Sequence, residues 1–190
     1  MDQIETMQQV VDQAKRILSG VRPDQLGAPS PCEDWDARGV IDHIAGGGKM
    51  FAAAFEQGSV PDALMGEIMT ADNVGDDPAA AFAAVGDSFM DAIRAPGALE
   101  RTLVLPWGEM PGTAALDLAI FDVTVHTWDL AKATDQVEAL DPDVLETALE
   151  VGRRIIQPEF RAPGVLGAEQ PVADGAPVAD RLAAFAGRQP

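Results

Sequence analysis

Two histidines and one aspartate are the residues of this chain best suited to bind a metal ion. Asp122 and His126 stand four positions apart in the stretch 116–133, LDLAIFDVTVHTWDLAKA, so on a helix they share one face. The only other histidine, His43, lies in the separate stretch VIDHIAGG. Two imidazoles and a carboxylate suit zinc with a position open for water, and oxygen-richer ligation would also admit nickel, iron or manganese. We therefore predict a divalent metal held between two helices by His43, Asp122 and His126.

Two further side chains near this group have alternative interpretations. Asp129 lies one turn beyond His126, where it is a candidate acceptor that orients the imidazole ring, or else a salt-bridged surface acid. Cys32 is expected to be a buried, inert thiol, because its neighbour Glu33 would raise its pKa. A third interpretation has no metal at all and leaves both histidines as core residues satisfied by hydrogen bonds.

Length, charge and composition limit the class of protein. The 190 residues fit one domain, 1–190, with 47% hydrophobic and only 5% aromatic residues, which indicates packed helices with a small-residue core. The net charge of −18 repels phosphate backbones, so nucleic-acid binding is not expected. No apolar run approaches the roughly 20 residues of a membrane span, and the acidic N-terminal stretch is unlike a signal peptide. We expect a cytoplasmic protein that is not associated with membranes.

Hydrophobic periodicity predicts the helices that must position these residues. Asp36 is a suitable cap for the helix that carries His43, and Pro78 suits the first turn of the next one. Asp141 and Pro142 play the same two roles further along the chain. The expected helices cover 4–18, 37–57, 78–94, 116–133, 142–157 and 180–187.

Two segments depart from the helical pattern. The run Gly46–Gly48 falls in the middle of a predicted helix, where each glycine costs roughly 1 kcal/mol relative to alanine. It allows a close neighbour, leaves room for a ligand beside His43, or breaks the helix. The segment 101–110 loses the helical period, and we expect an extended stretch or a short β-hairpin there, with Pro106 ending the strand Thr102–Leu105.

Four blocks of the sequence point to a known family: PCEDWDARGVIDHIAGG, LPWGEMPG, FDVTVHTWDLAKAT and DRLAAFAGRQP. They resemble the actinobacterial metal-binding proteins of the DinB-like superfamily, in the branch that contains mycothiol-dependent maleylpyruvate isomerase. The resemblance implies an all-α fold, a DinB-like four-helix bundle with a long crossover and extra C-terminal helices. It also implies a metal site of two histidines and an acid, which falls on His43, Asp122 and His126. Asp122 stands where the isomerase has glutamate, which shortens the reach of the carboxylate.

The resemblance implies a function as well. It indicates a metal-dependent enzyme that activates a thiol, such as mycothiol, for transfer to a small electrophile or for its isomerisation. The metal would replace the thiol proton as a Lewis acid. The same ion could activate water in a hydrolase, or fasten two helices in a non-catalytic metal-binding or ligand-sensing bundle. A homodimer is also compatible with the resemblance.

Overall fold

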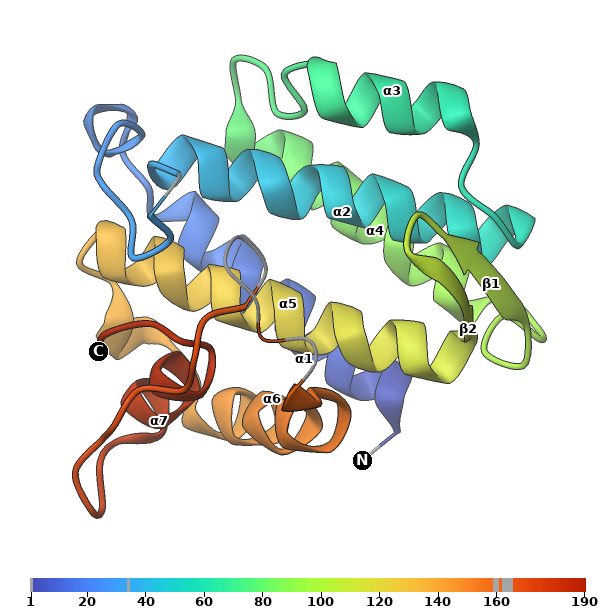
Figure 1. Cartoon of the computed structure of the whole chain (residues 1–190). Helices are drawn as coiled ribbons and strands as arrows, with labels where there is room; N and C mark the ends of the chain where they lie inside the picture. Colours follow the sequence, from blue (N-terminus) through green and yellow to red (C-terminus); the bar gives the residue numbers. More distant parts are fainter. Residues whose placement is uncertain (1, 34, 159–160, 162–165) are drawn as a thin grey trace.

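Four long helices form the body of the molecule. The computed structural model describes residues 2–33, 35–158, 161 and 166–190. Figure 1 shows α1 (Gln3–Ser19), α2 (Ala37–Gln57), α4 (Pro78–Arg94) and α5 (Gly112–Ala133) lying side by side. Both α1 and α2 pack against α4 and α5, so α1 and α2 occupy opposite corners of a four-helix bundle. The connection between them, residues 20–36, therefore has to cross the bundle. The resemblance implied a long crossover without placing it in the chain.

The remaining elements cover the bundle from outside. The short helix α3 (Asp62–Thr70) packs on α2, whereas α6 (Pro142–Ile155) and α7 (Val178–Phe185) pack on α5. Two 3-10 turns, η1 (Pro23–Gln25) and η2 (Val137–Ala139), lie in connections. The strands β1 (Thr102–Leu105) and β2 (Gly108–Pro111) form the expected antiparallel hairpin, with Leu105 opposite Gly108. The sequence prediction of an all-α fold with one short hairpin is confirmed.

Local capping explains why several helices begin where the sequence predicts. The Asp36 carboxylate accepts a hydrogen bond from the Gly39 backbone N–H at 2.8 Å, which satisfies a donor that α2 itself cannot. Asp77 does the same for α4 through the Ala80 N–H at 3.0 Å. Four predicted boundaries are wrong by two to four residues: α5 begins at 112 instead of 116, α6 ends at 155 instead of 157, and both ends of α7 differ, with 178–185 instead of 180–187.

The helix α5 is the most enclosed element of the described fold. It packs against α1, α2 and α6, and residues such as Leu116, Ala119 and Phe121 are buried on different sides of it. A helix covered on several sides needs apolar residues around most of its circumference, and a buried polar residue in it needs a partner. His126 and Asp129 are such residues, with exposed fractions of 7% and 0%. No helix in the described part of the chain is both long and apolar enough to cross a bilayer.

The three glycines in α2 have two different roles. A Cβ atom on Gly46 would lie 2.9 Å from Ile68 Cγ2, and one on Gly48 would lie 2.5 Å from Val85 Cγ1. These two glycines therefore let α3 and α4 approach α2 closely. A Cβ on Gly47 would meet nothing within 4 Å, so this position leaves open space. The helix continues through all three residues, and the alternative of a helix break is wrong.

Candidate metal centre

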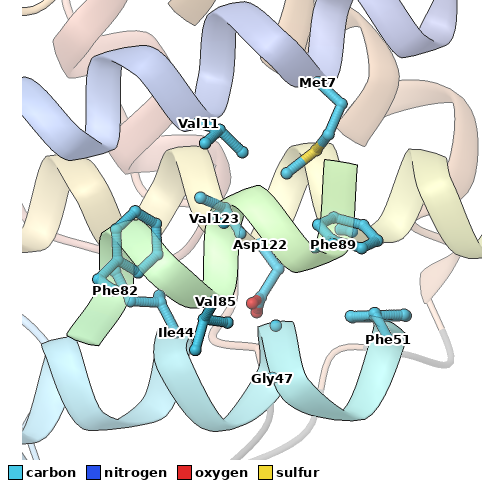
Figure 2. Close-up of a pocket in the computed structure, with 13 residues that line it drawn as sticks. Met7, Val11, Ile44, Gly47, Phe51, Phe82, Val85, Phe89, Asp122 and Val123 are labelled. Atoms are coloured by element: carbon cyan, nitrogen blue, oxygen red, sulfur yellow. The ribbon is translucent and has the colours of Figure 1, made fainter. Parts of the chain in front are cut away.

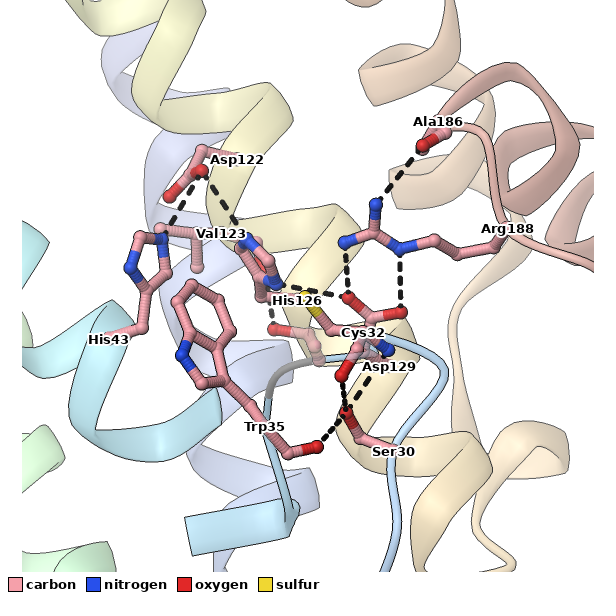
Figure 3. Close-up of polar contacts among 11 residues, drawn as sticks. Ser30, Cys32, Trp35, His43, Asp122, Val123, His126, Asp129, Ala186 and Arg188 are labelled. Carbon is pink, nitrogen blue, oxygen red and sulfur yellow. Dashed lines mark hydrogen bonds and ion pairs between the residues drawn. The ribbon is translucent and has the colours of Figure 1, made fainter. Parts of the chain in front are cut away.

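Three side chains from two helices converge at one face of α5. His43 comes from α2, and Asp122 and His126 come from α5 (Figure 3). The Nε2 atoms of His43 and His126 each lie 3.6 Å from Asp122 Oδ1. The two imidazole rings are 4.6 Å apart between centroids, with 69° between their planes. The structure therefore brings together the three residues that the sequence grouped.

The His43 Nε2 atom is the most informative atom of the group. It is buried and has no hydrogen-bond partner in the described part of the chain. Its separation from Asp122 exceeds a hydrogen-bond length, and buried polar atoms are rarely left without a partner. Ligand atoms placed at 2.0–2.1 Å around a tetrahedral zinc ion stand roughly 3.4 Å from one another, by geometry alone. The observed spacing and the donor set of two nitrogens and one oxygen therefore fit a bound divalent cation.

The opposite nitrogen of His126 is held by a buried ion pair. His126 Nδ1 lies 3.0 Å from Asp129 Oδ2. Arg188, from the segment after α7, donates to both carboxylate oxygens of Asp129, through Nη2 at 2.8 Å and Nε at 3.1 Å. A carboxylate in this place favours the tautomer in which Nδ1 carries the proton, so the Nε2 lone pair of His126 is directed toward Asp122. Asp129 lies in the interior, so its interpretation as a surface acid is wrong.

The charges of the cluster favour a cation. Burial alone would raise the pKa of Asp122, but the charge of His126 and the contact with His43 outweigh it and bring the pKa to about 2. Burial would lower the pKa of His43, whereas the Asp122 carboxylate outweighs burial and raises the pKa above its ordinary value. Burial would raise the pKa of Asp129, but the bonds from His126 and Arg188 hold the pKa below its usual range. Both carboxyl groups are therefore anions at neutral pH.

Sequence reasoning missed the contribution of the connection between α1 and α2. The Trp35 ring stacks on the His43 ring at 4.5 Å and lies 5.5 Å from the His126 ring, between centroids. Ser30 fixes this turn by donating from Oγ to the Trp35 carbonyl at 2.7 Å. Cys32, in the same connection, is half-buried instead of buried, and the structure places it beside His126 and Asp129. In the sequence these positions are marked only by the block PCEDWD, and the block does not show that its residues contact the histidines.

Cys32 raises the question of a second set of ligands. One ligand atom each from Cys32, His126 and Asp129 also lie within 4.8 Å of one another. In this set, however, the Asp129 carboxylate already accepts from Arg188 and lies against His126 Nδ1. The set of His43, Asp122 and His126 contains no such committed carboxylate, and it includes the unpaired Nε2 atom. The second set is therefore the weaker candidate.

The sequence of this helical bundle is similar to those of known proteins. The family model described as the mycothiol maleylpyruvate isomerase N-terminal domain matches residues 7–131. Two uncharacterized proteins of Mycobacterium tuberculosis, MT0763 and Rv0738, are each 37% identical over 193 residues, which cover 99% of this chain and 98% of theirs. The chain belongs to the mycothiol maleylpyruvate isomerase N-terminal domain family, and the predicted resemblance is confirmed.

Solved structures show the same fold. The crystal structure of the mycothiol-dependent maleylpyruvate isomerase superposes with a TM-score of 0.62 at 18% identity, over 77% of this chain and 66% of that chain. A histidine-to-alanine mutant of that isomerase gives 0.66 at 17% identity, over 88% of this chain and 73% of that chain. This chain therefore spans about two thirds of the length of the first of these structures. The matched family region ends before α6, so α6, α7 and Arg188 lie beyond it.

Proposed function

We propose that this chain binds one divalent metal ion and that zinc fits its donors best. With this ion, the protein acts as a thiol transferase or isomerase on a small electrophile. The single observation that carries the proposal is the buried His43 Nε2, which faces Asp122 at 3.6 Å without a hydrogen bond. A third ligand atom, His126 Nε2, stands at the same distance from the same oxygen. Membership in a family named for a mycothiol-dependent isomerase supports a thiol, such as mycothiol, as the co-substrate.

Three protein ligands are the number typical of catalytic zinc sites, because a position remains for water or substrate. When bound, a divalent cation supplies a Lewis acid that lowers the pKa of a thiol enough to give a thiolate near neutral pH. His43, Asp122 and His126 would hold the ion. Nickel, iron or manganese would be compatible with the same nitrogen and oxygen donors.

The surrounding residues support this role by orienting the ligands. The Asp129 carboxylate accepts a hydrogen bond from His126 Nδ1, and Arg188 in turn fixes Asp129. The Trp35 ring covers one face of His43 and restricts its rotation. A site whose ligands are held by packing and by outer hydrogen bonds needs little rearrangement when it is occupied.

A non-catalytic role for the metal has one observation in its favour. Asp122 and His126 lie on α5 and His43 lies on α2, so an ion bound by all three would cross-link two bundle helices. Such an ion would stabilise the fold whether or not a substrate reacts there. Metal analysis alone does not separate this function from catalysis, because both require the same ligands.

The variant His126→Ala separates the two functions. If the site is catalytic, the variant loses thiol-conjugating activity and at least ~100-fold of its zinc affinity, yet remains folded in urea titrations without zinc. If the ion is only structural, the zinc-loaded wild-type chain has no activity toward thiol and electrophile pairs. Chelation lowers the stability of the wild type in both cases, so activity is the readout that decides.

Thr127→Ala is the matched control. Thr127 is a buried neighbour on α5 whose hydroxyl donates only within its own helix, to the Val123 carbonyl at 2.7 Å. This control variant is expected to keep both zinc binding and activity. A wild-type chain that is purified without chelator and binds no zinc would contradict both functions.

A further inference from the structure

The candidate metal centre is more accessible to solvent on one side than on the other. The accessible fraction is 35% for the His43 side chain and 33% for the Asp122 side chain, but 10% for His126. The Trp35 ring lies against both imidazole rings, 4.5 Å from His43 and 5.5 Å from His126 between centroids. A substrate that reaches the centre therefore extends away from Trp35, past His43 and Asp122.

One face of α5 is left uncovered, and Asp122 belongs to it. From residue 114 to residue 131, every residue is buried except Ala114, Leu118 and Asp122, which stand four positions apart. Residues at this spacing share one face of a helix. This face leads from the metal centre toward the start of α5, where Figure 1 shows the hairpin of β1 and β2.

A face of α2 leads in the same direction. Gly47 follows His43 by one turn and Phe51 follows by two, and Figure 2 shows the Asp122 carboxylate directed toward Gly47. Asp122, Gly47 and Phe51 also line one small cavity, so the two faces adjoin each other. A Cβ atom added to Gly47 would meet nothing within 4 Å, so no described side chain fills the space next to it, between His43 and Phe51.

Trp107 lies where both faces end. The hairpin packs against α2 and α5, and the Trp107 ring lies 6.3 Å from the Phe51 ring between centroids, edge to face at 68°. Even so, 53% of Trp107 is exposed. The next residue, Gly108, has a φ of 124°, which residues with a side chain rarely adopt, so the turn that carries the ring has a defined shape. A large aromatic ring held in such a turn and half in solvent is suited to bind a ligand.

From this arrangement we propose that Trp107 binds the non-reacting part of the thiol co-substrate while the sulfur is at the metal centre. The inference rests on the proposed function and names the class of thiol: one whose tail carries a neutral ring, such as a sugar. His43 and Phe51 are eight residues apart, as are Asp122 and Ala114, so the tail has to reach about 12 Å from the sulfur. The indole ring can cover the apolar face of a sugar while the hydroxyl groups remain in water.

The charges along the two faces favour a neutral tail. Beyond Asp122, the two faces and Trp107 carry no charged side chain. Arg101, which directly precedes β1, already donates to two backbone carbonyls at the end of α2, at 3.0 and 3.1 Å. An anionic tail would therefore gain no ion pair from these residues, in a chain whose net charge is −18. A metal ion about 12 Å away would not offset this, because the Debye length in physiological salt is about 8 Å.

Cobalt in place of zinc gives a binding assay, because a thiolate bound to cobalt(II) has a charge-transfer absorption. Mycothiol carries sugar-type rings on its acetylated cysteine, and N-acetylcysteine methylamide has the same reacting end, also neutral, without the rings. The wild type should bind mycothiol at least about tenfold more tightly than the amide, and Trp107→Ala should lose most of this preference through weaker binding of mycothiol alone. Trp107→Phe should keep much of it, because an aromatic face remains. Val104→Ala is the matched control, since Val104 is 47% exposed on the same hairpin, and it should leave both affinities unchanged.

Equal losses for the two thiols in Trp107→Ala would show that the ring acts only through the fold, and the inference would be wrong. It would also be wrong if Trp107→Ala left both affinities unchanged, and a dimer lost in that variant would then assign the ring to a contact between two copies of the chain. Failure to bind cobalt would contradict the proposed function instead, and NMR of the metal-free chain would then decide the inference. Mycothiol at millimolar concentration should shift the indole N–H signal that is missing from Trp107→Phe, and absence of this shift would overturn the inference.

Discussion

His126 is held at one ring nitrogen, and this contact decides where the other nitrogen points. Its Nδ1 faces Asp129 at 3.0 Å and its Nε2 faces Asp122 at 3.6 Å. The carboxylate on the Nδ1 side is itself fixed by Arg188, 59 residues away in the sequence. Because the ring cannot turn without breaking the Asp129 contact, its second nitrogen stays directed at the site.

Loss of Arg188 should therefore weaken metal binding without touching a ligand. In Arg188→Gln the buried Asp129 carboxylate loses its cationic partner, so we expect zinc affinity to fall about 10- to 100-fold. We also expect a loss of about 3–5 kcal/mol in the free energy of unfolding, because a buried charge is left unpaired. Zinc titration calorimetry and urea unfolding measure the two effects.

Arg181→Gln is the control for this prediction. Arg181 also lies in the C-terminal part of the chain, but its ion pair with Glu146 is partly exposed to solvent, with 31% and 42% of the two side chains accessible. Exposed pairs contribute little, so we expect less than about 1 kcal/mol and unchanged zinc affinity. Equal losses in the two variants would show that Arg188 acts only by holding the C-terminal segment in place.

At the scale of elements, α2 and α5 must be placed side by side for His43 to reach Asp122. The start of α2 is fixed by Asp36, whose side chain accepts from the Gly39 N–H. Asp36→Ala removes this cap and should cost about 1 kcal/mol of stability in urea titrations. Asp2 is a matched control, because it is the N-cap of α1 but makes no side-chain cap bond. If Asp2→Ala and Asp36→Ala destabilise equally, capping by Asp36 is not what stabilises α2.

The helices could be predicted where capping residues and hydrophobic periodicity mark them locally. Within the site, spacing in the sequence could pair only residues that lie on the same helix. Asp36 and Pro78 stand at their helix starts, so the bounds of α2 and α4 were correct. The first turn of α5 was missed because Gly112 and Thr113 have weak helical propensity, and the hairpin before them determines where the helix begins. The pairing of Asp122 with His126 follows from helical spacing. His43 was added because it is the only other histidine of the chain and lies on another apolar helix.

Arg188 and Trp35 could not be found in this way. Arg188 reaches Asp129 only because α6 and α7 fold back on α5, which no periodicity in the sequence encodes. Trp35 lies in an irregular connection, so its contact with His43 depends on the turn that Ser30 and the neighbouring backbone form. Contacts between distant segments are set by tertiary packing, and a single sequence does not display them.

At the scale of the whole molecule, protons compete with the metal for the same nitrogens. Without metal, Asp122 raises the pKa of His43 above its ordinary value, so the folded chain holds that proton more tightly than the unfolded chain. This contribution to stability is fully present below about pH 6.5, the ordinary value for histidine, and it is lost as the pH rises through the folded pKa. Zinc requires neutral imidazole, so its stabilising effect has the opposite dependence on pH.

Stabilisation by zinc should therefore increase from pH 5.5 to pH 8. At a free zinc concentration of ~100 Kd the gain is about 2.7 kcal/mol, which corresponds to a rise of about 5–10 °C in Tm for a chain of this length. Thermal scans with zinc and with chelator, across this pH range, give the difference directly. A zinc-induced rise in Tm that is constant or larger at pH 5.5 would show that histidines are not the ligands.

X-ray absorption at the zinc edge, on the chain loaded with one equivalent of zinc, tests the central claim most directly. Convergence of His43, Asp122 and His126 on one ion predicts nitrogen and oxygen neighbours at about 2.0–2.1 Å, with the outer scattering of two imidazole rings. Binding by the set that contains Cys32 would instead add a sulfur neighbour at about 2.3 Å and show a single imidazole. A spectrum of that second kind, or a chain that takes up no zinc, would contradict the account.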